Sequence, residues 1–176
     1  MRDIINLDYS LLIPEYLLGL VAIAIIAVDL FLPKANKKAL PIIALLGLAA
    51  AFGVSLAYID TTDNFAGLFF IDDFTTFFRC FFIAITIAVV LASIDFVELH
   101  LKNPAEYYAL LLISTAGAIF MAGAQELLTA YIGLEILSFS LYVLVSYQKS
   151  DTRSNEAGMK YPVSYTHITL PTIIIV

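Results

Sequence analysis

Residues that bind metals or form cross-links are scarce in this sequence. Cys80 is the single cysteine, so no disulfide can form within the chain, and His100 and His167 do not form a cluster with metal-ligand spacing. Charged residues make up 14% of the 176 residues, compared with about 25% in ordinary soluble domains. No basic stripe could contact phosphates, and no Gly-rich phosphate loop or Ser-His-Asp order is visible. The sequence therefore predicts no nucleic-acid partner, no bound metal and no site for chemistry on a small organic substrate.

Apolar residues are abundant instead, at 61% of the chain. Five segments reach the roughly 17–25 residues that a tilted helix needs to cross the hydrocarbon core of a bilayer. Backbone polar groups in lipid must be paired within the segment, so these segments are expected to be helices. The predicted spans cover about residues 11–32, 40–59, 74–96, 107–123 and 127–147. The predicted fold is an all-α polytopic transmembrane helix bundle with five spanning helices and the start of a sixth, and short connections make sequential helices antiparallel.

The first apolar segment could also be a signal peptide, because it lies close to the N-terminus and follows Arg2. However, it is longer than the usual apolar region of about 7–15 residues. It also leads into Pro33 and Lys34 rather than a cleavage site made of small residues. A first spanning helix is the better interpretation.

Basic residues in the short connections predict the orientation, because lysine and arginine are retained on the cytoplasmic side. They follow the first, third and fifth spans, as Lys34, Lys37, Lys38, Lys102, Lys149, Arg153 and Lys160. The alternate connections contain Asp60, Asp63, Gln125 and Glu126. We therefore expect the N-terminus on the non-cytoplasmic side of the membrane.

Three charged residues within the apolar segments fit an interfacial position. Arg79 is near the outer end of the third span, where it could reach toward Asp72 or Asp73, and we interpret it as an interfacial anchor before a functional residue. Glu15 and Asp29 lie toward opposite ends of the first span, where interfacial solvation is enough to explain them.

Glu135 is the most informative residue, because it lies near the middle of the fifth span, where a carboxylate is costly unless it is protonated, paired or facing water. Tyr131, Glu135, Ser138 and Tyr142 are spaced four, three and four residues apart and therefore share one helix face. A buried carboxylate with hydroxyl groups above and below it is what a proton relay needs. The alternative is that Glu135 bonds a neighbouring helix and serves only packing.

Small residues mark the fourth span and are expected to allow close approach of a neighbouring helix. They are Ser114, Thr115, Gly117, Ala118 and Gly123.

The end of the chain departs from the pattern of apolar spans. Pro162 and Pro171 frame a polar stretch that would prevent a normal span. Residues 163–172 also resemble the conceptual translation of a transposon-derived sequencing adapter. We therefore expect residues 1–161 to form the membrane domain, as part of a longer protein, and residues 162–176 to be a non-native tail.

The stretch from Tyr131 to Leu144 resembles the fifth helix of the subunit N family of proton-pumping NADH:quinone oxidoreductase, respiratory complex I. The segment from Ser154 to Tyr161 is similar to the family's sixth helix at its start, and weaker similarities occur at 71–74 and 106–111. The family consists of antiporter-like subunits with two inverted five-helix repeats, each with a broken helix, and a buried row of charges across the membrane.

The resemblance implies that Glu135 pairs with a lysine of the seventh helix, beyond this chain, and that Lys160 is the family's lysine at the start of helix six. Both are then proton-translocation residues, and Tyr131, Ser138 and Tyr142 are candidate relay groups. It also implies that NADH, FMN, the iron–sulfur clusters and quinone bind elsewhere in the complex, so we expect no cofactor and no autonomous catalysis in this chain.

The expected function is proton translocation coupled to electron transfer from NADH to quinone. The expected partners are other membrane subunits of complex I and the lipid bilayer of a bacterial inner membrane. A subunit of a multisubunit cation/proton antiporter is a close alternative, although such relatives tend to carry tryptophan before the helix-five glutamate and this chain has none. A non-transporting membrane scaffold is a third alternative, and it predicts no further buried lysines downstream.

Overall fold

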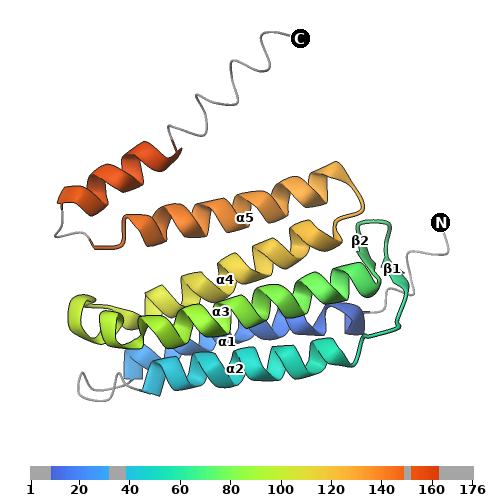
Figure 1. Cartoon of the computed structure of the whole chain (residues 1–176), viewed down its shortest axis with the longest axis horizontal. Coiled ribbons are helices and arrows are strands. Elements are labelled where there is room, and N and C mark those ends of the chain that lie inside the picture. Colours follow the sequence, from blue (N-terminus) through green and yellow to red (C-terminus); the bar gives the residue numbers. More distant parts are fainter. Residues whose placement is uncertain (1–8, 32–38, 149–151, 163–176) are drawn as a thin grey trace, which may run out of the picture.

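The computed structural model describes residues 9–31, 39–148 and 152–162 and contains five long helices (Figure 1). They are α1 (Ile13–Phe31), α2 (Ala39–Leu56), α3 (Asp73–His100), α4 (Pro104–Gly123) and α5 (Leu127–Val145). A short 3₁₀ helix, η1 (Tyr9–Leu12), leads into α1. All five long helices are long and apolar enough to cross a membrane, and a further helix over residues 152–162 follows α5. The chain is therefore a multi-pass membrane protein, as predicted, and the start of a sixth helix is present.

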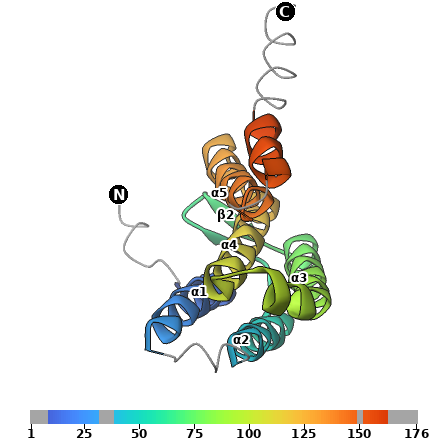
Figure 2. The same cartoon turned by 90° about the vertical axis from the view of Figure 1, so that its left-hand side faces the viewer.

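The first four long helices pack together, whereas α5 lies at the edge of the bundle and packs against α4 (Figures 1 and 2). The packing of α1 follows from its apolar pattern, because Leu18, Ala22 and Ile25, spaced four and three residues apart, are buried on one face. On the opposite faces large apolar side chains such as Leu20 and Ile23 remain exposed. In a membrane protein that outer surface meets lipid or further protein rather than water.

Helix α3 begins and ends at residues outside the apolar run. Its N-cap is Asp72, whose carboxylate accepts a hydrogen bond from the Thr75 backbone N–H at 2.8 Å. It continues to His100, four residues beyond the predicted end at residue 96. In its last turn Glu98, Leu99 and His100 are exposed whereas Val97 is buried, so the helix extends past the apolar stretch.

The connection between α2 and α3 contains a small β-hairpin that the sequence analysis did not predict. Strands β1 (Asp63–Phe65) and β2 (Phe69–Ile71) pair antiparallel. Ala66 and Gly67 have φ values of 57° and 74° in the turn between them. The hairpin is joined to the α4–α5 connection, because the Gln125 N–H donates to the Leu68 carbonyl at 3.0 Å. It thereby covers one end of the bundle (Figure 1).

Helices α4 and α5 approach each other closely at two glycines. A Cβ atom at Gly117 would lie 2.7 Å from the Leu137 backbone nitrogen, and one at Gly133 would lie 2.7 Å from the Met121 backbone nitrogen. Such distances leave no room for a side chain. The interpretation of the small residues in the fourth span as a close-packing surface is confirmed at Gly117.

Residues 163–176 lie outside the described residues, so the expectation that the tail is non-native stays a prediction. Residues 34–38, on which part of the predicted orientation depends, also lie outside them.

Candidate functional site

The polar stripe of α5 lies on the face that turns away from α4. Gly133 and Ser140 are buried toward α4, whereas Glu135 is exposed and Tyr131 is 56% exposed. The expectation that Glu135 points into the bundle is therefore wrong for the described chain. The reason is that α5 has only one long helix beside it: 11% of its span is buried, compared with 50% for α4. Tyr131 lies one helix turn before Glu135 on this same face.

The other end of the stripe is partly covered by the helix over residues 152–162. The rings of Tyr142 and Tyr161 meet edge to face with centroids 5.2 Å apart. Gly158 lies against Ser146, whose hydroxyl donates to the Tyr142 carbonyl at 3.0 Å. Ser138 and Tyr142 are half-buried as a result. The stripe thus runs from the open part of α5 toward the sixth helix.

Lys160 lies on the exposed side of that sixth helix. Its ammonium pairs with Glu156 one turn earlier, at 2.5 Å, and the two side chains are 73% and 62% exposed. The structure therefore pairs Lys160 with Glu156 of its own helix. It does not bring Lys160 together with Glu135.

A second charged site, which the sequence analysis interpreted wrongly, lies between α1 and α3. Arg79 is fully buried and pairs with Glu15, with the Arg79 Nη2 and Glu15 Oε1 atoms 2.7 Å apart and both side chains 0% exposed. Neither the interfacial anchor assigned to Arg79 nor the solvated end position assigned to Glu15 is correct. The two residues are 64 positions apart, and each alone sits near a helix end, so only the folded bundle, in which their side chains reach each other, reveals the pair.

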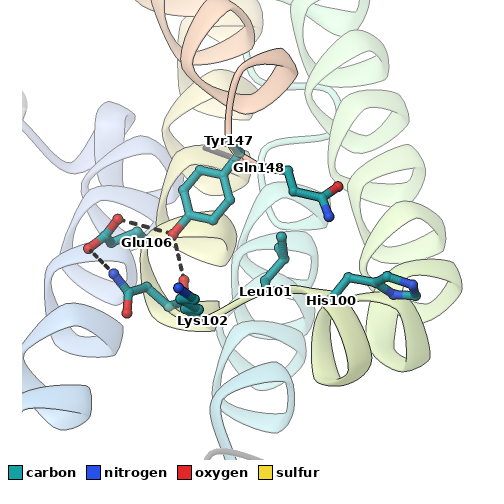
Figure 3. A pocket seen from close by; sticks show the side chains of 7 residues that line it. His100, Leu101, Lys102, Glu106, Tyr147 and Gln148 are labelled. Atoms are coloured by element: carbon teal, nitrogen blue, oxygen red, sulfur yellow. Dashed lines mark hydrogen bonds between the residues drawn. The ribbon is translucent and has the colours of Figure 1, made fainter. Parts of the chain in front are cut away.

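A polar cluster at the end of the bundle opposite the hairpin joins α5 to α4 (Figure 3). The Tyr147 hydroxyl lies 2.6 Å from the Asn103 carbonyl and 3.0 Å from the Glu106 carboxylate. Burial, followed by Glu106, raises the pKa of Tyr147, so its hydroxyl stays a donor in the neutral range. The cluster lines a small open cavity together with His100, Leu101, Lys102 and Gln148.

The part of the chain that contains the α5 stripe is similar to a known family. A family model described as "NADH:quinone oxidoreductase/Mrp antiporter, TM" matches residues 124–168. NADH-quinone oxidoreductase subunit N 1 of Koribacter versatilis is 39% identical over 166 residues, which cover 88% of this chain and 32% of the relative. Subunit N of Dehalococcoides mccartyi is 37% identical over 154 residues, or 86% of this chain and 31% of the relative. The chain is homologous to NADH-quinone oxidoreductase subunit N.

A solved structure agrees with this homology to subunit N. A chain of respiratory complex I from Thermus thermophilus with bound aureothin matches at a TM-score of 0.68 and 25% identity. The match covers 85% of the present chain and 32% of that chain, so this chain spans about a third of the length of the proteins it matches.

The part matched by the family model contains every site residue predicted from the sequence, namely Tyr131, Glu135, Ser138, Tyr142 and Lys160. The similarity to subunit N therefore includes the α5 stripe and the start of the sixth helix. The residues that the sequence analysis missed, Glu15 and Arg79, lie outside that part.

Proposed function

We propose that this chain forms part of a proton-translocating membrane subunit that couples electron transfer from NADH to quinone to proton movement. The homologues named as subunit N of NADH-quinone oxidoreductase support this proposal. The observation that carries it is the carboxylate of Glu135 in the middle of a spanning helix, with hydroxyl groups on the same face.

Glu135 is the group that takes up and releases the proton in this proposal. Tyr131 lies one turn before it on the same helix face, and Ser138 and Tyr142 lie after it along the helix. Successive groups are one turn apart, about 5.4 Å along the axis, so water must connect them. The exposed face of α5 requires cover by further helices in the complete subunit, because an open carboxylate in lipid would be unfavourable.

Lys160 provides a positive charge beyond the other end of the stripe. We assign it to the same row of charges, with Glu156 as its partner in the described chain. A charge change elsewhere in the complex would alter which carboxylate the Lys160 ammonium faces, and the protonation of the other groups in the row would change with it. Glu135 would then gain or lose its proton in response.

The remaining reactions take place outside this chain in the proposal. NADH, FMN, iron–sulfur clusters and quinone bind other parts of the complex, and the chain contacts other membrane subunits and lipid. The N-terminus and the β-hairpin face the non-cytoplasmic side of a bacterial inner membrane, whereas the α3–α4 connection faces the cytoplasm.

The deciding experiment replaces Glu135 in the full-length subunit within the intact complex. Glu135→Gln preserves shape and hydrogen bonding but removes the titratable proton, so NADH-driven acidification of membrane vesicles should fall while assembly persists. Glu126→Gln is the matched control, because Glu126 is an exposed N-cap residue just before the same helix. Wild-type pumping by Glu135→Gln at normal complex levels would show that Glu135 serves only packing.

A subunit of a multisubunit cation/proton antiporter is the second candidate, because the matching family model includes such antiporters in its description. The same vesicles distinguish the two. Proton movement that requires NADH and stops with a quinone-site inhibitor supports the first function. Proton movement driven by a sodium gradient without NADH supports the second function. The absence of both activities would support a scaffold.

A further inference from the structure

The ion pair between α1 and α3 leaves two of its polar atoms unused. Arg79 Nε donates to Glu15 Oε1 at 2.9 Å, and Arg79 Nη2 contacts the same oxygen and also the Leu11 carbonyl at 3.3 Å. One carboxylate oxygen and one backbone carbonyl therefore satisfy three of the five N–H donors of the guanidinium. Glu15 Oε2 and Arg79 Nη1 are buried and have no hydrogen-bond partner among the described residues.

Buried polar atoms of charged groups are almost always hydrogen-bonded, because otherwise they lose their hydration without replacement. Here one unsatisfied atom is an acceptor on an anion and the other is a donor on a cation. A single partner that serves both atoms must therefore both donate and accept. A monatomic cation bound to Glu15 Oε2 would lie beside the positive charge of Arg79. A monatomic anion bound to Arg79 Nη1 would lie beside the negative charge of Glu15. Both arrangements are repulsive.

We propose that the Glu15–Arg79 pair holds internal water, which donates to Glu15 Oε2 and accepts from Arg79 Nη1. Water is the small ligand that has both functions and no charge. The site is then a hydrated ion pair enclosed between α1 and α3. It is separate from the α5 stripe and does not depend on the function proposed for Glu135.

Two aromatic rings enclose this site. The Arg79 Cζ atom lies 5.6 Å from the centroid of the Tyr58 ring and 6.0 Å from that of the Phe69 ring. Tyr58 is half-buried and its hydroxyl bonds the Ser10 carbonyl, whereas Phe69 belongs to β2 and is only 2% exposed. Phe69 therefore lies beside the pair at the hairpin end of the bundle and is an internal reporter of water bound there.

Hydroxyl-radical footprinting of the intact complex in isotope-labelled water tests the proposal. X-rays convert a bound water into a radical that adds to a neighbouring ring, even where bulk solvent has no access. Phe69 should be modified several-fold faster than Tyr108, which is equally buried at 1% exposed and lies in α4 away from the ion pair. Modification of Phe69 no faster than that of Tyr108 would overturn the proposal.

The double variant Glu15→Leu/Arg79→Met removes both unsatisfied atoms together and leaves an apolar contact. In this variant the modification of Phe69 should fall to the rate of Tyr108. An unchanged rate would mean that the ion pair does not hold the water, and the assignment would be wrong. If the variant fails to assemble, the comparison of Phe69 with Tyr108 in the wild type still decides.

Discussion

At the scale of single residues, the energetics of the Glu15–Arg79 pair depend on both partners being present. Removing a charge from water costs several kcal/mol, and the attraction between two such charges offsets this cost only when they touch. Both side chains are fully buried and share a 2.7 Å contact. Loss of one partner therefore leaves the other as an uncompensated charge in the interior.

The first prediction follows from this dependence. Glu15→Leu and Arg79→Met should each destabilise the subunit by about 3–5 kcal/mol, whereas Glu15→Leu/Arg79→Met should be close to the wild type. The measurement is the fraction of this subunit that stays soluble when the purified complex is heated. If the double variant were destabilised by as much as the two single variants added together, the two residues would not interact.

The second prediction concerns the Tyr147 hydroxyl, which joins the end of α5 to the start of α4. Tyr147→Phe removes its bonds to the Asn103 carbonyl and Glu106 and should destabilise the subunit by about 1 kcal/mol near neutral pH. Burial, and after it Glu106, raises the pKa of Tyr147 above its usual value of 10.0. A raised pKa means that the folded state favours the protonated hydroxyl. Its contribution is therefore present below about pH 10 and is lost as the pH rises toward the folded pKa.

The same heating assay at neutral and at strongly alkaline pH provides the test of this second prediction. The gap between the wild type and Tyr147→Phe should narrow at alkaline pH. Tyr16→Phe, at an exposed position on α1, is the control and should have little effect at either pH. A gap that is independent of pH would contradict the assigned role of the hydroxyl.

The sequence was sufficient to find Glu135 but not the Glu15–Arg79 pair, and the difference is physical. A carboxylate in the middle of an apolar run is unusual wherever the neighbouring helices lie. Glu15 and Arg79 each lie within two turns of a helix end, where water is normally available. Only the η1 segment, Tyr58 and the hairpin remove that water, and none of these contacts has a signature in the sequence. Conversely, Glu135 is exposed because α4 is the one long helix beside α5 among the described residues.

At the scale of elements, the contact between α4 and α5 depends on the absence of side chains. Gly117 and Gly133 face each other across it, and the Gly133 site would place a Cβ atom 3.0 Å from the Gly117 carbonyl oxygen. Because lipid is as apolar as the helices, close packing rather than hydrophobic burial must hold such a pair together. The spacing of small residues in α4 predicted this surface correctly.

The third prediction tests that contact. Gly133→Ala would force the Met121 backbone away from α5 and should destabilise the α4–α5 pair by about 1–3 kcal/mol. Gly53→Ala is the matched control, because a Cβ atom at Gly53 of α2 meets nothing within 4 Å, and it should be neutral or slightly stabilising. The readout is proteolysis at the α4–α5 connection. Equal cleavage of the two variants would show that the helices can separate without cost.

The β-hairpin could not be predicted from its own residues. Residues 63–71 contain a polar half and an apolar half, and neither half is long enough to form an independently stable strand pair. The hairpin forms because Phe69 packs at Gly123 and the Leu68 carbonyl accepts a bond from Gln125. Gly123 ends α4 and Gln125 lies in the α4–α5 connection, so both partners come more than fifty residues later in the chain. Spanning helices, by contrast, follow from local composition alone.

At the scale of the whole molecule, sequential antiparallel helices sort the connections into two groups at opposite ends of the bundle. The hairpin and the α4–α5 connection lie at one end, and the α3–α4 connection lies at the other (Figure 1). Acidic residues such as Asp60 and Asp63 occur at the first end, whereas Lys102 occurs at the second. The retention of basic residues on the cytoplasmic side therefore predicts that the hairpin end faces the outside.

The last prediction tests this assignment together with the number of spans. In a Cys80→Ser background, Thr62→Cys and Lys102→Cys place single thiols at exposed positions on opposite ends of the bundle. A membrane-impermeant maleimide should label Thr62→Cys in intact spheroplasts, whereas Lys102→Cys should react only in inverted vesicles. Labelling of both thiols from the same side would contradict the antiparallel crossing of α3. If Lys102→Cys reacted in spheroplasts and Thr62→Cys only in inverted vesicles, the number of spans would stand and the orientation would be reversed. The charge bias at the two ends would then not decide the topology.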